Sequence, residues 1–291
     1  MPLAHICLAI LVAAIYGTAF VAIQIAVNEI PPLMATGYRY LLTALPLLFF
    51  IKKPDVPWLI LAAYGVSQGV IMFGLIFTAI KLGMPGGLAS LVVQAQVFFT
   101  IGFALLVFGE RPNVQQLFGA FVAFCGIGVI ALGLRASAPL IPFFMTLASA
   151  AIWGVANIIS KTAKPNSMLG FVVWSAAFAP LPLFALSSIF EGTGFGVFPI
   201  FPPSPKAIGA LLYLAYPTTV FGFSAWVFLL QRHNAAIVTP FALLVPIFGM
   251  ASMALVFGER FTEMTAFGSV LVFIGLLVAV LPRHKLAQLS R

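Results

Sequence analysis

Charged residues are scarce in this 291-residue chain, which has only 6 acidic and 14 basic side chains, or 7% charged residues in total. A soluble domain has about 25% charged residues, so these side chains are too few to cover a water-facing surface. Apolar residues make up 63% of the chain and the mean hydropathy is +1.16. The sequence therefore predicts an integral membrane protein surrounded by a lipid bilayer.

Acidic residues are rarer than basic ones, which gives a formal net charge of +8. Such a charge can indicate a nucleic-acid partner, but these basic residues lie singly in short loops and not along one face. The pattern instead indicates the positive-inside bias of membrane proteins. We therefore expect no nucleic-acid partner.

Cysteine and familiar catalytic motifs are also nearly missing. Cys7 and Cys125 lie in apolar segments far apart in the sequence, so we interpret them as buried thiols with no metal or disulfide pattern. The chain contains no Walker motif, no HExxH and no CxxC. We expect no enzyme activity, no cofactor and no metal site.

Long apolar runs are abundant. A membrane helix needs about 20 mostly apolar residues. Short polar segments divide the sequence into ten apolar stretches of about this length. The first lacks a basic leading region and is too long for a signal peptide, so we interpret it as a retained span. We therefore expect an all-α, polytopic membrane protein without a soluble domain. Its ten transmembrane helices are expected at residues 3–27, 33–51, 57–80, 86–108, 114–134, 139–160, 168–190, 206–230, 235–257 and 263–282.

The basic residues outside the spans indicate the orientation. With the N-terminus inside, nine of them lie inside and four outside, which fits the positive-inside rule. We therefore expect both the N- and C-termini to be cytoplasmic. The inner set is Lys52, Lys53, Arg111, Lys161, Lys164, Arg232, Arg283, Lys285 and Arg291, and the outer set is Lys81, Arg135, Lys206 and Arg260.

Similarities between the two halves indicate a duplication, with repeats at residues 1–137 and 138–291 and five spans in each. Because five is odd, the second repeat must enter the membrane from the opposite side. Such an inverted repeat is typical of transporters that open to each side in turn; a duplication that merely built a large bundle is the alternative. The similarities include FGER at 108–111 and 257–260, FG at 118–119 and 267–268, and AAIYG at 13–17 with AAIWG at 150–154.

Two glutamines, Gln94 and Gln96, interrupt an otherwise apolar run in the fourth span. On a regular α-helix they point about 200° apart, so we expect only one of them to face a central cavity and the other to bond to a neighbouring helix. Which of the two is central stays open. Contact between helices is an alternative role for either amide.

Aromatic and amide side chains lie at equivalent places in the first and sixth spans. Tyr16 and Phe20 correspond to Trp153 and Asn157 in the second repeat. Facing each other near mid-membrane, they would form a cavity suited to an amphipathic small molecule, although ordinary core packing is the alternative. The third and eighth spans add Gln68 and Tyr213 as further candidate substrate contacts.

Arg39 is the only basic residue well inside a span, and five prolines interrupt other spans. A buried guanidinium needs carbonyl or anionic partners, so Arg39 could attract a substrate carboxylate or serve a structural pairing. Each proline removes a backbone hydrogen bond and permits a bend, which predicts hinges. The hinge candidates are Pro46, Pro182, Pro217, Pro240 and Pro246.

Mid-membrane carboxylates and imidazoles are lacking altogether. Every Asp, Glu and His falls in a loop or at the end of a span. Proton-coupled transport usually places such a group in mid-membrane to carry the proton. The sequence therefore favours uncoupled, facilitated transport and disfavours a multidrug cation antiporter.

These features resemble a known family. Ten spans in two halves, with LVFGER closing the fourth span of each half, resemble the EamA-type members of the drug/metabolite transporter superfamily. The segments IPPLMATGYRY and KLGMPGGLASLVVQAQVFFT are similar to the bacterial O-acetylserine/cysteine exporter subgroup. By this resemblance, Arg39, Gln94 and Gln96 stand where the subgroup has the same residues, whereas Tyr16 replaces a tryptophan.

The resemblance implies an exporter of neutral amino acids or related metabolites in the cell inner membrane. It also implies a central cavity lined by both halves, with the hairpins of spans three–four and eight–nine moving as gates. A proton-coupled metabolite or drug antiporter and a solute channel remain as alternatives. The exact substrate and the oligomeric state stay open at this point.

Overall fold

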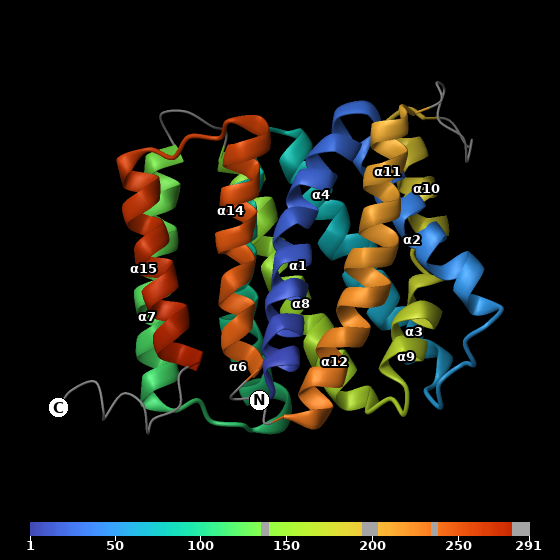
Figure 1. Cartoon of the computed structure of the whole chain (residues 1–291), viewed down its shortest axis with the longest axis horizontal. Coiled ribbons are helices and arrows are strands. Elements are labelled where there is room, and N and C mark those ends of the chain that lie inside the picture. The colour runs from blue at the N-terminus through green and yellow to red at the C-terminus, as the bar shows by residue number, and fades with distance from the viewer. Residues whose placement is uncertain (135–139, 194–202, 234–237, 281–291) are drawn as a thin grey trace.

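The computed structural model describes residues 1–134, 140–193, 203–233 and 238–280, and every regular element in these ranges is a helix (Figure 1). Five segments form the first half: α1 (Leu3–Glu29), α2 (Pro32–Leu48), α3–η1–α4 (Trp58–Tyr64, Gly65–Met72, Phe73–Lys81), α5–η2–α6 (Gly86–Val92, Val93–Ala95, Gln96–Phe108) and α7 (Val114–Leu134). Five more form the second half: α8 (Leu140–Ala163), α9–α10 (Met168–Ala176, Pro180–Phe190), α11–η3–α12 (Pro205–Tyr213, Leu214–Gly222, Phe223–Arg232), η4–α14 (Thr239–Leu243, Leu244–Phe257) and α15 (Glu263–Val280).

These helices have the length and composition of membrane spans. Within the described ranges, seven are long and apolar enough to cross a bilayer, and two shorter apolar helices cover Phe241–Phe257 and Glu263–Ala279. The segments follow the ten predicted stretches in order. The prediction of an all-α, polytopic membrane protein is therefore confirmed.

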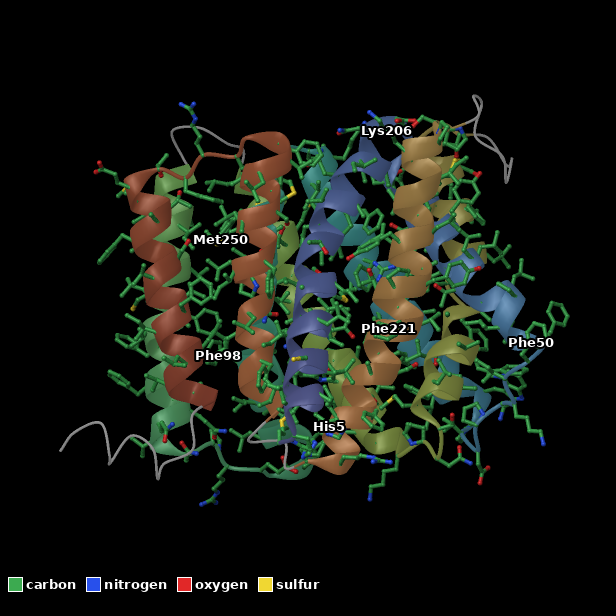
Figure 2. All side chains as sticks on the ribbon, viewed as in Figure 1. His5, Phe50, Phe98, Lys206, Phe221 and Met250 are labelled. Carbon is green, nitrogen blue, oxygen red and sulfur yellow. The ribbon has the colours of Figure 1, made fainter. Side chains whose placement is uncertain are left out.

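The outer surface of the bundle is apolar, as a lipid-facing surface must be. Large side chains such as Phe121 and Leu255 are exposed, and apolar side chains project outward between the two edges of the bundle (Figure 2). Cys7 and Cys125 are also exposed, so their interpretation as buried thiols was wrong. A thiol is only weakly polar and can lie on a lipid-facing surface.

The two edges of the bundle are defined by the ends of its helices. Figure 1 shows that α1 begins and α15 ends at the same edge, here called the N-terminal edge. The other is called the opposite edge; α1 ends there at Glu29 and α5 begins there at Gly86. An even number of crossings brings the first and last helix ends to one edge.

Several helices carry local distortions close to the predicted hinges. Segments three and eight contain π-helices, Gly65–Met72 and Leu214–Gly222, and the second includes Pro217. Pro240 lies in η4, Pro246 near the start of α14, and Pro46 and Pro182 inside α2 and α10. Segment seven breaks at residues 177–179, just before Pro180 rather than at Pro182. Whether the five prolines act as hinges stays a prediction.

The helices of the two halves exchange equivalent contacts. α1 packs against α14, and α8 packs against α6. A Cβ added at Gly17 would lie 2.6 Å from the Phe248 Cβ, and one added at Gly154 would lie 3.0 Å from the Phe99 Cβ. The two glycines are the last residues of AAIYG and AAIWG, and the two phenylalanines are 149 positions apart in the chain.

Helices α7 and α15 form an antiparallel pair at one end of the bundle (Figure 1). Glycines bring their backbones together, since a Cβ at Gly119 would lie 2.6 Å from the Gly275 oxygen and one at Gly126 would lie 2.6 Å from the Gly268 oxygen. The residue numbers run in opposite directions along the contact. This geometry makes the pair intolerant of larger residues.

Replacing Gly126 with valine is expected to lower the melting temperature of the detergent-purified protein, because overpacking a tight contact costs about 1–3 kcal/mol. The matched control is Gly128→Val on the same helix, where an added Cβ meets no atom within 4 Å. Thermal melts followed by size-exclusion chromatography compare the two variants. Equal melting temperatures would contradict this account of the contact.

Candidate functional site

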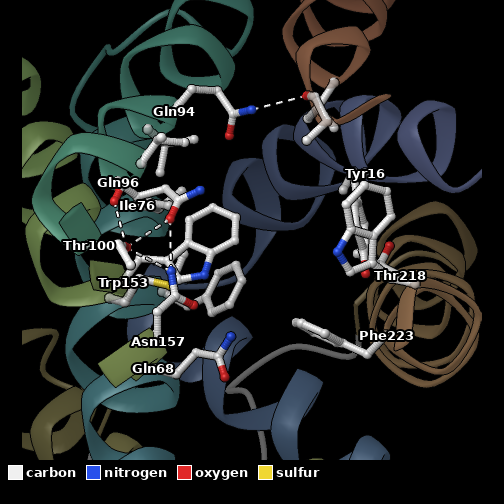
Figure 3. A pocket seen from close by; sticks show the side chains of 18 of the residues that line it. Tyr16, Gln68, Ile76, Gln94, Gln96, Thr100, Trp153, Asn157, Thr218 and Phe223 are labelled. Atoms are coloured by element: carbon white, nitrogen blue, oxygen red, sulfur yellow. Dashed lines mark hydrogen bonds between the residues drawn. The ribbon is translucent and has the colours of Figure 1, made fainter. Parts of the chain in front are cut away.

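A cavity of about 570 Å³ lies between the two halves of the chain, lined by residues of both (Figure 3). This volume falls in the usual range for small-molecule sites. The wall is mostly apolar and aromatic with scattered polar groups. The side chains that carry polar atoms are Tyr16, Arg39, Gln68, Gln94, Gln96, Thr100, Gln116, Trp153, Asn157, Thr218 and Trp226.

Most predicted site residues lie together in this lining. Those present are Tyr16, Phe20, Arg39, Gln68, Gln94, Gln96, Trp153 and Asn157. Tyr213 lies outside it: its hydroxyl is 2.6 Å from the Thr18 hydroxyl and donates to the Ile15 carbonyl at 3.2 Å. Tyr213 therefore connects α11 to α1, and the substrate contacts of the other residues remain predictions.

Both glutamines of the fourth span line the cavity, so the prediction that only one could do so was wrong. The reason is local, because the 3-10 helix Val93–Ala95 contains Gln94 and ends just before Gln96. At three residues per turn, the two side chains point about 120° apart. On a regular α-helix they point about 200° apart, which is about 160° when it is measured the shorter way around the helix axis. Each also bonds to another element: Gln94 donates to the Ala242 carbonyl at 3.1 Å, and Gln96 bonds to Asn157 on α8.

A small network of amides and a hydroxyl crosses from α6 to α8 (Figure 3). The Asn157 side-chain NH₂ donates to the Gln96 side-chain oxygen at 2.8 Å and to the Thr100 hydroxyl at 3.0 Å. The Thr100 hydroxyl donates to the Gln96 carbonyl at 2.7 Å. Both donor positions of Asn157 are then used, which leaves its side-chain oxygen as an acceptor toward the cavity.

Arg39 is a buried cation in the cavity wall, with only 1% of its surface exposed. Its Nη2 donates to the Thr219 hydroxyl at 3.2 Å, and its guanidinium carbon lies 3.9 Å from the centre of the Phe73 ring. Nε and Nη1 have no hydrogen-bond partner. Within the described ranges the single ion pair is Lys161–Glu110, so no described carboxylate neutralises Arg39.

The lining carries no Asp, Glu or His side chain in the part of the chain that the structure describes. The cavity therefore combines one cation with neutral amides, hydroxyls and aromatic rings. Such a wall can bind small molecules, and it holds no described group that titrates near neutral pH. The same ranges contain no cluster of three or more His, Cys, Asp or Glu suited to a metal ion.

The sequence contains one pattern that resembles a catalytic motif, GVSQG at residues 65–69, which matches GxSxG. In hydrolases this serine sits on a sharp turn between a strand and a helix. Ser67 instead lies within the π-helix η1, and its hydroxyl donates to the Ala63 carbonyl at 2.7 Å. The structural context of a nucleophile is therefore missing here.

Several lining residues of the eighth segment were not predicted from the sequence. Thr218, Phe223 and Trp226 face the cavity from η3 and α12. Comparing segments three and eight as repeat partners would have indicated Thr218, because it lies 150 positions after the predicted Gln68. Gln116 near the start of α7 was missed as well.

The lining extends toward the N-terminal edge, and carboxylates connect the two halves at the opposite edge. Gln116 and Ala279 lie in the turns of α7 and α15 nearest the N-terminal edge, and both line the cavity. At the opposite edge, three carboxylates each accept backbone N–H bonds from a segment of the other half. The bonds are Glu29 to Ser204, Glu191 to Leu33 and Met34, and Glu259 to Gly86 and Gly87.

The Glu259 carboxylate has a shifted acidity. Partial burial raises the pKa of Glu259, and its bonds with Gly87 and Gly86 oppose that shift. Desolvation therefore disfavours the ionised form of Glu259 at this contact.

A multi-pass helical bundle with a central cavity between two similar halves defines a membrane transporter. The chain matches the EamA-like transporter family twice, over residues 3–132 and 140–281. It therefore belongs to this family and is a transporter, not an enzyme. The predicted family is confirmed.

Individual relatives share nearly the whole chain. It is 38% identical over 280 residues to a "Probable amino-acid metabolite efflux pump" of Escherichia coli (strain K12), covering 94% of this chain and 93% of the relative. A protein of the same name from Salmonella typhimurium is 39% identical over 282 residues, with the same coverage. The "Uncharacterized inner membrane transporter YedA" of E. coli (strain K12) is 26% identical over 276 residues. The match covers 91% of this chain and 87% of the YedA chain. A solved structure titled "Crystal structure of protein" has the same fold, with a TM-score of 0.65, 19% identity and 99% coverage of both chains.

Proposed function

We propose that this protein exports neutral amino acids or related small metabolites across the inner membrane, by alternating access and without ion coupling. The observation that carries the proposal is the central cavity, whose described wall combines aromatic rings, neutral amides and one cation without any acid or imidazole. Two relatives that match over 93% of their own length are named probable amino-acid metabolite efflux pumps.

The two halves provide the frame for alternating access as an inverted repeat, residues 1–137 and 138–291. The antiparallel contact of α7 with α15 supports this, because those helices hold equivalent places in the two halves. So do the equivalent contacts of Gly17 and Gly154. The proposed boundary at residues 137–138 falls outside the described residues. An inverted repeat can exchange the conformations of its halves and open the cavity to each side in turn.

The N-terminal edge is proposed to face the cytoplasm. The excess of Lys and Arg in the loops at that edge supports this orientation. The relative named as an inner membrane transporter supports the location. In this orientation the cavity reaches toward the cytoplasm, and the carboxylate contacts of Glu29, Glu191 and Glu259 close the outer edge.

The lack of a proton carrier in the described cavity wall supports uncoupled transport. A carrier that exchanges protons for substrate usually needs a group that titrates inside the membrane. The proposed movements are of the hairpins of segments three–four and eight–nine. The first hairpin would bend at η1 and η2, and the second at the distortions that adjoin Pro217, Pro240 and Pro246.

The experiment is counterflow in proteoliposomes loaded with single neutral amino acids, with and without a pH gradient. We expect saturable uptake that is stimulated by internal substrate and does not accumulate further when a pH gradient is imposed. Accumulation driven by the gradient would instead establish a proton-coupled antiporter. Flux that neither saturates nor responds to internal substrate would establish a channel.

A further inference from the structure

Arg39 carries a charge that the described protein does not neutralise. It is 1% exposed, and its Nε and Nη1 have no partner. Burying a charge is costly unless it is paired and hydrogen-bonded. Arg39 lines the cavity, but its two unpaired nitrogens have almost no accessible surface, so a counter-ion in the cavity pairs with them when the guanidinium turns toward it.

The surroundings of Arg39 fit a planar anion. A guanidinium offers parallel N–H donors that match the two oxygens of a carboxylate. The Phe73 ring at 3.9 Å and the Thr219 hydroxyl at 3.2 Å fix the guanidinium from other directions. Tyr16 lines the same cavity, and its buried hydroxyl has no partner either, so it can supply one more donor.

In the described ranges the rest of the wall has no anionic group that would pair with a positive charge. Within the described ranges the acceptors toward the cavity are the side-chain oxygens of amides such as Gln94 and Asn157, which are neutral. Transferring an ammonium from water to such a site costs far more than transferring a neutral amide N–H. The rings of Phe20, Trp153 and Phe223 cover the apolar part of a ligand.

We infer that Arg39 binds the carboxylate of the substrate and that the site does not require a charged amine, so that monoanions such as N-acylated amino acids are accepted at least as well as free amino acids. This inference rests on the proposed transport function and names the substrate class of the same cavity. The recognised chemistry is one carboxylate, a neutral hydrogen-bonding group and an apolar side chain.

The test uses the counterflow assay with four matched competitors: leucine, N-acetyl-leucine, leucine methyl ester and leucinamide. We expect N-acetyl-leucine to inhibit at least as strongly as leucine. The ester and the amide lack the carboxylate, and we expect them to be about tenfold to hundredfold weaker, as for the loss of a charged hydrogen bond. An ester as strong as leucine, or an N-acetyl derivative that does not inhibit, would overturn the inference.

Variants of Arg39 provide the second measurement. Arg39→Met is expected to abolish the difference in inhibition between leucine and its methyl ester. Arg39→Lys is expected to retain part of this difference, because lysine carries the charge without the bidentate donors. The control is Arg232→Gln, which removes an exposed cation at the end of α12. If the Arg39 variants do not fold, the competitor series on the wild type still tests whether the site recognises the carboxylate. If the wild type shows no counterflow of any amino acid, the proposed function fails and the inference with it, whereas counterflow without carboxylate selectivity refutes the inference alone.

Discussion

Replacing Asn157 with leucine is expected to reduce transport about tenfold to hundredfold while the protein still folds. The leucine side chain has a similar size, but it donates neither the 2.8 Å bond to Gln96 nor the 3.0 Å bond to Thr100. Both bonds are partly buried, and each typical hydrogen bond contributes about 0.5–1.5 kcal/mol. The variant also loses the amide oxygen that faces the cavity, so binding of a polar substrate group weakens as well.

Counterflow rates, normalised to the amount of monodisperse protein in the liposomes, measure this effect. The matched control is Asn28→Leu, because Asn28 accepts a 2.9 Å bond from Gln24 in an exposed pair outside the cavity lining. The control is expected to transport at the wild-type rate. An Asn157→Leu protein with wild-type rates would show that the α6–α8 network has no part in transport.

The positions of the helices could be predicted closely from the sequence. The expected stretches 86–108 and 114–134 coincide with Gly86–Phe108 and Val114–Leu134, and 3–27 ends two residues before α1 does. The reason is that a bilayer requires a nearly fixed length of apolar residues and places charges at the ends.

The internal shape of the helices could not be predicted in this way. Hydropathy does not distinguish a regular α-helix from the π-helix Gly65–Met72 or the 3-10 helix Val93–Ala95. These distortions depend on the neighbouring helices. The error over Gln94 and Gln96 came directly from assuming a regular helix.

The candidate site was predictable as far as its residues are unusual in a membrane. Arg39, Gln68 and Asn157 stand out because polar groups are expensive in an apolar span. Phe223 and Trp226 do not stand out, since aromatic residues are common on lipid-facing surfaces as well. Tyr213 met the same criterion as the lining residues, yet its hydroxyl bonds to Thr18 and Ile15. Only the packing of the helices separates these cases.

Replacing Glu259 with alanine is expected to open the cavity toward the opposite edge of the membrane. The Glu259 carboxylate accepts N–H bonds from Gly86 at 2.7 Å and Gly87 at 3.0 Å, and it thereby holds the start of α5 against the other half. A Cβ at Gly87 would lie 2.8 Å from the carboxylate and 3.0 Å from the Met250 backbone, so this contact needs glycine. Loss of the acceptor leaves helix N-terminal donors unpaired, at a cost of about 1–3 kcal/mol.

The repeat itself offers the control, because Glu110 holds the same place in the first FGER sequence. Glu110 pairs with Lys161 at 2.6 Å, and both side chains are about half exposed. Exposed ion pairs contribute about 0–1 kcal/mol, so Glu110→Ala is expected to have a much smaller effect. The readout is labelling of Val97→Cys, a cavity position, by an impermeant maleimide added from outside, in a background without Cys7 and Cys125.

The same contact predicts a dependence on external pH. Partial burial raises the pKa of Glu259 while the edge is closed, and exposure on opening returns the pKa to its ordinary value. The state with the higher pKa binds protons more tightly, so acidification favours the closed edge, and this advantage is lost as the pH rises through the raised pKa. Labelling of Val97→Cys from outside should therefore fall on acidification. Glu259→Gln keeps one acceptor oxygen but cannot titrate, so it should remain closed and lose the pH dependence; a pH response that persists in this variant would assign the effect to another group.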